Sequence, residues 1–65
     1  MEKNRLKEVR FFKKVSQWQL RVFTGLSQSK ISLIEMGYVI PSKEEKSKIS
    51  RALGVTPAEI FPEAT

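Results

Sequence analysis

The stretch GLSQSKISLIEMG, residues 25 to 37, has the apolar spacing of a helix but an unusual set of polar residues. Ile31 and Ile34 recur at the interval that places two side chains on one face of an α-helix. Glu and Lys usually cover a helix face that contacts only water. Here the remaining positions carry mostly short, hydrogen-bonding side chains: Ser27, Gln28, Ser29, Lys30 and Ser32. This surface indicates a helix that touches a polar partner.

Glycines and capping signals divide the chain into five helices. Gly25, Gly37 and Gly54 end apolar-periodic segments, where a helix C-terminus often needs a left-handed residue. Three pairs have the spacing of a capping box, a hydroxyl residue followed three positions later by Glu or Gln: Ser16 with Gln19, Ser42 with Glu45, and Thr56 with Glu59. These signals predict helices over residues 4–14, 17–24, 28–36, 43–53 and 57–61, and therefore a compact all-α domain.

Only three residues, Gly25 to Ser27, connect the second predicted helix to the third. Because so short a turn cannot return the chain antiparallel, the two helices must cross steeply, as in a helix-turn-helix over about residues 17–36. In such a unit the second helix turns its N-terminal end outward and buries its rear face. A helical wheel then places four residues opposite the isoleucines: Gln28, Ser29, Ser32 and Leu33.

These outward residues suit the reading of bases in the major groove of DNA. Gln28 can form a bidentate contact with adenine, and Leu33 can meet the methyl group of thymine. The hydroxyl of Ser29 or Ser32 can pair with either a donor or an acceptor. The plain alternative is a solvated helix face, with Ser27 acting only as its N-cap.

The composition excludes several classes of protein. Sixty-five residues without Cys, His or Asp leave no disulfide framework, no His-based triad and no thiolate zinc site, so we expect neither an enzyme nor a cofactor or metal. No apolar run reaches transmembrane length and no signal peptide is present, which predicts a cytoplasmic protein that does not contact membranes. The net charge of +5 suits a polyanion such as double-stranded DNA, although it also favours simple solubility.

Residues 16 to 42, SQWQLRVFTGLSQSKISLIEMGYVIPS, resemble the signature of Cro/C1-type helix-turn-helix repressors. The matching positions are Ser16-Gln17, Leu20, Gly25-Leu26-Ser27-Gln28, Ile31-Ser32, Ile34-Glu35, Gly37 and Pro41. The ending RALGVTPAEIF, residues 51 to 61, is also similar, so the resemblance extends over most of the chain. It implies a single lambda-repressor-like domain over residues 1–65, with five helices and a DNA-binding function.

The resemblance also implies roles for individual residues. Together with the helical wheel, it assigns the base contacts to Ser27, Gln28, Ser29, Ser32 and Leu33. Contacts to phosphate fall to Gln17, Lys30, Tyr38 and Lys43, and Gln17 would also brace Gln28. Arg10 and Glu35 match an internal ion pair between the first helix and the recognition helix. Ile60 and Phe61 match a dimer contact in the last helix.

Several positions depart from the family pattern. Arg21 replaces a preferred alanine, Lys46 replaces a usual core leucine, and Ser50 replaces a usual alanine. Large apolar residues instead occupy positions that are often polar: Phe11, Trp18, Val22 and Phe23. We expect Phe12 and Phe23 to rebuild the core that Lys46 and Ser50 weaken. Phe11 and Trp18 fit a core position and an exposed patch equally well.

The sequence thus predicts a transcriptional regulator that represses by binding a roughly palindromic operator as a homodimer, without a small-molecule ligand. One alternative is a protein-interaction module, such as an antitoxin or adaptor, that uses an aromatic patch around Phe11 and Trp18. Another is an architectural protein that binds DNA without sequence preference. Gln28 and Leu33 argue against the latter, since neutral side chains at base edges add nothing to non-specific binding.

Overall fold

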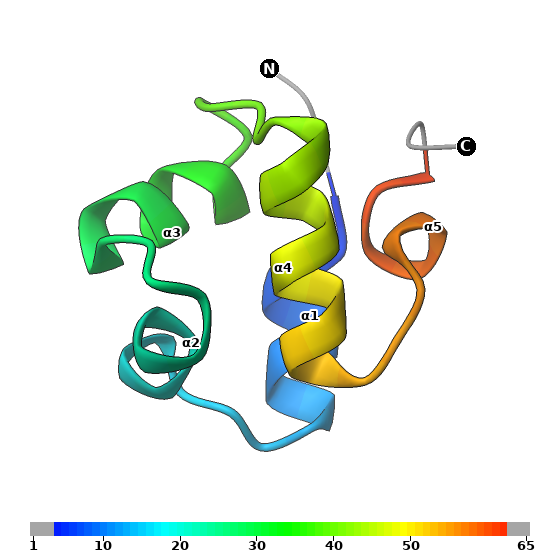
Figure 1. Cartoon of the computed structure of the whole chain (residues 1–65), viewed down its shortest axis with the longest axis horizontal. Helices are drawn as coiled ribbons and strands as arrows, with labels where there is room; N and C mark the ends of the chain where they lie inside the picture. Colours follow the sequence, from blue (N-terminus) through cyan, green and yellow to red (C-terminus); the bar gives the residue numbers. More distant parts are fainter. Residues whose placement is uncertain (1–3, 63–65) are drawn as a thin grey trace.

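The structure, a computed structural model, describes residues 4–62, and this part of the chain contains five helices and no strand (Figure 1). The helices are α1 (Leu6–Phe12), α2 (Gln17–Thr24), α3 (Gln28–Glu35), α4 (Lys43–Leu53) and α5 (Pro57–Ile60). In Figure 1, α4 stands at the centre, with α2 and α3 on one side and α5 on the other. The prediction of an all-α, five-helix domain is confirmed.

Capping boxes set the start of two of the longer helices where the sequence placed them. The hydroxyl groups of Ser16 and Ser42 accept hydrogen bonds from the backbone N–H groups of Gln19 and Glu45, at 3.0 and 3.1 Å. In return, the side chains of Gln19 and Glu45 each accept the serine N–H at 2.9 Å. These reciprocal bonds satisfy donors that an open helix end would leave unpaired, so α2 and α4 begin at the predicted residues.

α1 is shorter at both ends than the predicted range of 4–14. Asn4 lies before the helix, where its side-chain oxygen accepts the N–H of Leu6 at 2.9 Å. Its amide nitrogen donates to the carbonyl of Ile34 at 2.9 Å, which ties the start of α1 to α3. At the other end, Lys14 has a φ of 60°, and this left-handed conformation stops the helix. α3 and α5 each end one residue earlier than predicted.

The core forms where the inner faces of the five helices meet. Its buried side chains are Leu6, Val9, Leu20, Ile31, Ile34, Ile49, Leu53, Ile60 and Phe61. α2 packs against both α3 and α4, while α1 packs against α3 and α5 against α4. Leu26, in the turn between α2 and α3, is partly buried against this core and so holds the corner in place.

The prediction that Phe12 and Phe23 rebuild the core is wrong. Their side chains are 82% and 60% exposed. On α2, Thr24 takes the buried position instead of Phe23, because it lies one turn from Leu20 on the same face. Its hydroxyl donates to the carbonyl of Leu20 at 2.7 Å, so the buried polar group is satisfied.

Lys46 and Ser50 are accommodated without these two phenylalanines. The ammonium group of Lys46 lies 5.5 Å from the ring centroid of Phe61, within the range of a cation–π contact. Ser50 is buried, and its hydroxyl donates to the carbonyl of Lys46 at 2.7 Å. Phe61, which is itself buried, therefore packs beside the polar part of α4.

Candidate nucleic-acid interface

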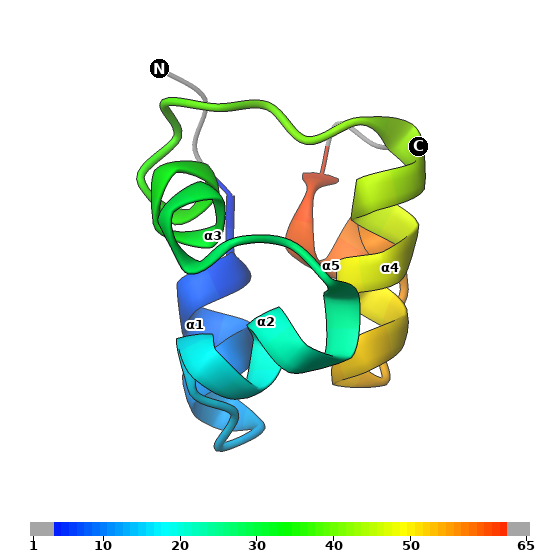
Figure 2. The same ribbon diagram turned by 60° about the vertical axis from the view of Figure 1, so that its left-hand side comes forward.

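A tight turn positions α3 against α2. Gly25 has a φ of 78°, and its N–H donates to the carbonyl of Arg21 at 2.8 Å, which closes α2. Arg21 itself is exposed, so its long side chain does not separate the two helices. The hydroxyl of Ser27 then accepts the N–H of Lys30 at 3.1 Å and starts α3. As a result α2 and α3 cross steeply, and α3 lies at the outer edge of the domain (Figure 2).

The outer face of α3 carries the residues predicted to contact bases. Ile31 and Ile34 are fully buried, which fixes the rotation of the helix about its axis. The opposite face is open: Ser27, Gln28, Ser29 and Leu33 are exposed and Ser32 is partly exposed. The structure thus leaves Gln28, Ser29, Ser32 and Leu33 accessible on α3 and Ser27 accessible at its N-cap.

A chain of polar contacts runs from the interior to this face. Nε of Arg10 donates to Glu35 at 2.7 Å, and the two side chains are only 7% and 4% exposed. Glu35 also accepts a hydrogen bond from the amide of Gln17 at 2.9 Å. The oxygen of Gln17 in turn accepts from the amide of Gln28 at 3.5 Å, a long hydrogen bond. Gln28 is therefore linked, through Gln17, to a buried ion pair.

Two further contacts hold Arg10, at the buried end of this series of polar contacts. A terminal nitrogen of Arg10 donates to the carbonyl of Val15 at 3.0 Å. The ring of Phe11 lies 4.8 Å from the guanidinium carbon of Arg10 and stacks on its charge. Phe11 nevertheless remains largely exposed, as does Trp18. Within residues 4–62, no buried side-chain nitrogen or oxygen lacks a hydrogen-bond partner.

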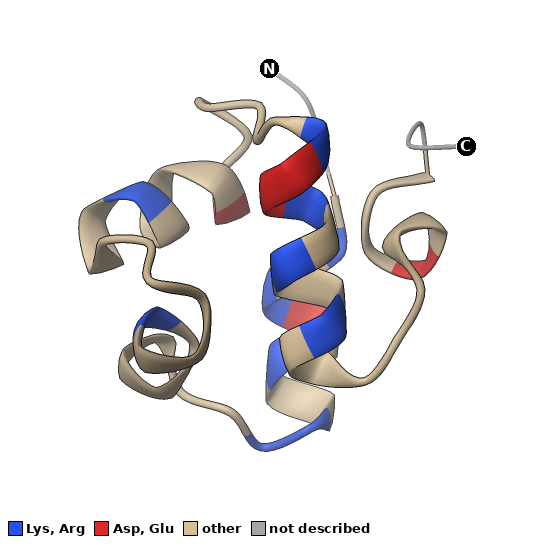
Figure 3. Cartoon of the chain, in the orientation of Figure 1, with Lys and Arg blue, Asp and Glu red and all other residues tan. Residues whose placement is uncertain are grey.

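The predicted phosphate-contacting residues differ in whether their side chains are already paired within the protein. Nζ of Lys30 forms an ion pair with Glu45 at 2.6 Å and thereby joins α3 to α4. The hydrogen bond from Lys30, followed by that from the Ser42 backbone, lowers the pKa of Glu45 below its usual range. Tyr38, in the loop after α3, and Lys43, the first residue of α4, are exposed. Basic residues continue along most of α4 (Figure 3).

Ile60 and Phe61, the positions that match a dimer contact in the family, lie inside this protomer. Both side chains are buried in the core against α4. They therefore present almost no surface to a second copy, since Ile60 is 0% and Phe61 3% exposed. Exposed neighbours in α5, Ala58 and Glu59, remain accessible.

Sequence reasoning missed three connections at this site. It did not identify Glu45 as the partner of Lys30, Glu35 as the acceptor for Gln17, or Asn4 as a link between α1 and α3. Each connection joins residues at least fifteen positions apart, and no local spacing signals it. The loop after α3 also exposes Ile40 and Tyr38, each 65% exposed.

The comparisons with known proteins agree with this geometry. A helix-turn-helix family model matches residues 13–60, which is most of the chain and includes α2, α3 and the turn between them. No curated protein matches the sequence. Among residues 4–62, no helix has both the length and the apolar character needed to span a membrane. The steep α2–α3 crossing, the outward polar face of α3 and the extent of the match together show that the chain belongs to the Cro/C1-type helix-turn-helix family of DNA-binding transcription regulators.

Proposed function

We propose that this regulator is a repressor that reads a palindromic operator as a homodimer, with α3 of each protomer in the major groove. The observation that carries the proposal is the support of Gln28 by Gln17 and the buried Arg10–Glu35 pair. A side chain that is already oriented loses less conformational entropy on binding, which favours sequence-specific contacts. An exposed Gln28 without such support would lose more conformational entropy when it contacts a base.

In this arrangement the neutral residues supply specificity and a separate set supplies affinity. Gln28 pairs with adenine, Leu33 packs on a thymine methyl group, and the α3 serines complete the base contacts. Gln17, Tyr38 and Lys43 contact phosphates on either side of α3. Lys30 contributes less than a free lysine, because Glu45 neutralises part of its charge in the unbound protein.

The short length of α3 favours a homodimer. One eight-residue helix contacts only a few base pairs, so two copies on half-sites one helical turn apart, about 34 Å, give the required discrimination. Since Ile60 and Phe61 are buried, the dimer contact falls to exposed α5 residues such as Ala58. Repression then results from occupancy of the operator, which blocks access of polymerase.

The test is selection of random duplex DNA by the purified protein at near-physiological salt. We expect enrichment of two inverted half-sites whose centres lie about one helical turn apart. Gln28→Ala should lose about 1–3 kcal/mol of preference for the selected site while keeping its helical content, because Gln28 is exposed. Lys7→Ala, an exposed change on α1, serves as the control and should leave the preference unchanged.

The other outcomes separate the alternatives. Binding without any enriched sequence, unaffected by Gln28→Ala, would establish an architectural protein. Failure to retain duplex DNA would refute the repressor and favour the protein-interaction module. The exposure of Trp18 favours that second candidate, and Trp18→Ala would then remove the partner.

A further inference from the structure

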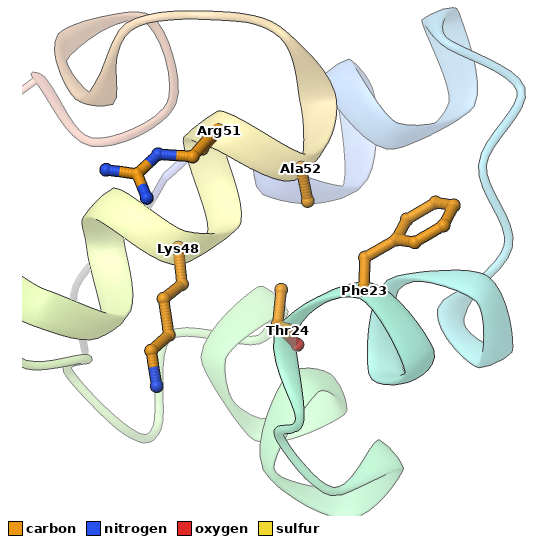
Figure 4. Close-up of a pocket in the computed structure, with 5 residues that line it drawn as sticks. All are labelled: Phe23, Thr24, Lys48, Arg51 and Ala52. Atoms are coloured by element: carbon orange, nitrogen blue, oxygen red, sulfur yellow. The ribbon is translucent and has the colours of Figure 1, made fainter.

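A shallow groove lies between the end of α2 and the second half of α4, and none of the residues proposed to contact DNA lines it. Its walls are formed by Phe23, Thr24, Lys48, Arg51 and Ala52 (Figure 4). Its volume of about 350 Å³ is at the lower end of the range for ligand sites. We refer to these five residues as the α2–α4 groove.

The α2 wall of the groove carries an exposed aromatic ring. Figure 4 shows the ring of Phe23 at one side of the groove and the side chains of Lys48 and Arg51 on α4 at the other, with the guanidinium of Arg51 directed away from Phe23. The Phe23 side chain is largely exposed, and so are Trp18 and Val22 farther along α2. Several large apolar side chains left exposed on one helix favour a binding surface over a purely solvated one.

The α4 wall carries two cations that have no carboxylate partner among the described residues. The ion pairs within residues 4–62 are Arg5–Glu8, Arg10–Glu35 and Lys30–Glu45, so Lys48 and Arg51 lie outside all of them. Arg51 stands in the last turn of α4, where a positive charge stabilises the helix dipole. Lys48 stands in the middle of α4 and has no such role.

The one hydroxyl in the groove is already engaged. The hydroxyl of Thr24 donates to the carbonyl of Leu20 at 2.7 Å and accepts a hydrogen bond from the N–H of Leu26 at 3.2 Å. The groove therefore offers an aromatic ring and two positive charges, but few free neutral hydrogen-bonding groups. A partner that suits it must supply negative charge and an apolar group together.

We propose that the α2–α4 groove binds an acidic segment of another protein, which places an apolar side chain against Phe23 and carboxylates beside Lys48 and Arg51. Carboxylates complement the two unpaired cations, and the apolar side chain covers the exposed ring. The phosphate backbone of DNA would match the charges but would gain nothing from Phe23. This proposal does not depend on operator recognition, since Gln28 and its supports lie outside the groove.

The test starts from a library of random short peptides displayed against the full chain. The peptides that bind should be enriched in Asp and Glu next to a large apolar residue. An enriched peptide is then titrated by fluorescence anisotropy against the native protein, Phe23→Ala and the double variant Lys48→Gln/Arg51→Gln. We expect each variant to weaken binding by about tenfold, since an aromatic anchor and a pair of charges each contribute this much at a small interface.

A double variant on α1, Lys7→Gln/Lys13→Gln, is the matched control. Both double variants remove two of twelve basic residues, so each lowers the net charge from +5 to +3. All four replaced residues are exposed, so circular dichroism should show an intact fold in both proteins. The control should change peptide affinity by no more than about twofold, because its two charges are exposed on α1, do not line the groove and are screened by salt.

Three results would overturn the proposal. The first is a selected peptide pool without an excess of acidic residues. The second is an equal loss of affinity in the two double variants, which would show a response to net charge alone. The third is a fall of about two in the salt-dependence slope of DNA binding for Lys48→Gln/Arg51→Gln but not for the control, because the two cations would then contact phosphate.

Discussion

Replacing Glu35 with glutamine removes a buried charge while keeping the size of the side chain. In the native protein this carboxylate, which is 4% exposed, accepts hydrogen bonds from Arg10 at 2.7 Å and Gln17 at 2.9 Å. In Glu35→Gln, the guanidinium of Arg10 keeps its charge in a place that water hardly reaches. Glu45→Gln is the matched control, because it removes the charge from the more exposed Lys30 pair while glutamine still completes the capping box of α4.

The two substitutions should differ several-fold in their effect on stability. Removing one partner of a buried ion pair destabilises a protein by about 3–5 kcal/mol, whereas an exposed pair contributes about 0.2–1 kcal/mol. We expect a loss of about 3 kcal/mol for Glu35→Gln, since the amide oxygen still accepts one hydrogen bond, and less than about 1 kcal/mol for Glu45→Gln. A domain of 65 residues has a free energy of unfolding of about 3–10 kcal/mol, so the first loss is a large share of it.

Urea unfolding followed by far-UV circular dichroism measures both losses, provided that the slope of free energy against urea is unchanged. Equal midpoints for the two variants would refute the reasoning that burial decides the contribution of these pairs. The double variant Arg10→Met/Glu35→Leu separates charge from packing. It should recover most of the stability, because both charges leave together, yet lose operator preference because Gln17 has no anchor.

Further substitutions test single features of the fold. Hydrogen bonds lower the pKa of Glu45 below its usual 4.5, so the stability that this carboxylate adds to the fold is complete above pH 4.5 and is lost as the pH falls through the folded pKa. The difference in melting temperature between the native protein and Glu45→Gln should therefore shrink in acid. A difference that stays constant with pH would contradict this. Gly25→Ala should cost about 1–2 kcal/mol in urea unfolding, from the left-handed backbone alone, since no heavy atom lies within 4 Å of the added methyl group. Ser50→Ala should change the free energy of unfolding by less than about 1 kcal/mol, because its hydroxyl bonds only to carbonyls of its own helix; a larger loss would mean that this bond supports the core.

Short-range signals account for what could be predicted of the helices. The Ser16 and Ser42 capping boxes and the turn at Gly25 involve residues within four positions of each other, so their bonds follow from local sequence alone. The end of α1 was not predicted correctly, because Lys14 adopts the left-handed conformation that glycine usually takes. Lysine has no special preference for this conformation. The outward face of α3 was equally predictable, since Ile31 and Ile34 define the buried side.

The sequence by itself determined the all-α class, the helix-turn-helix and the polar face of α3, because all three depend on periodicity and turn length. Only the tertiary structure decided which apolar residues are buried, because several helix faces carry side chains that could have formed the core. The close-packed interior has a limited volume. It contains Thr24 and Phe61 but not Phe12 or Phe23. The tertiary structure also decided that Lys30 is paired with Glu45, since contacts between distant residues depend on how helices pack. The exposed aromatic wall of the α2–α4 groove is a consequence of that packing.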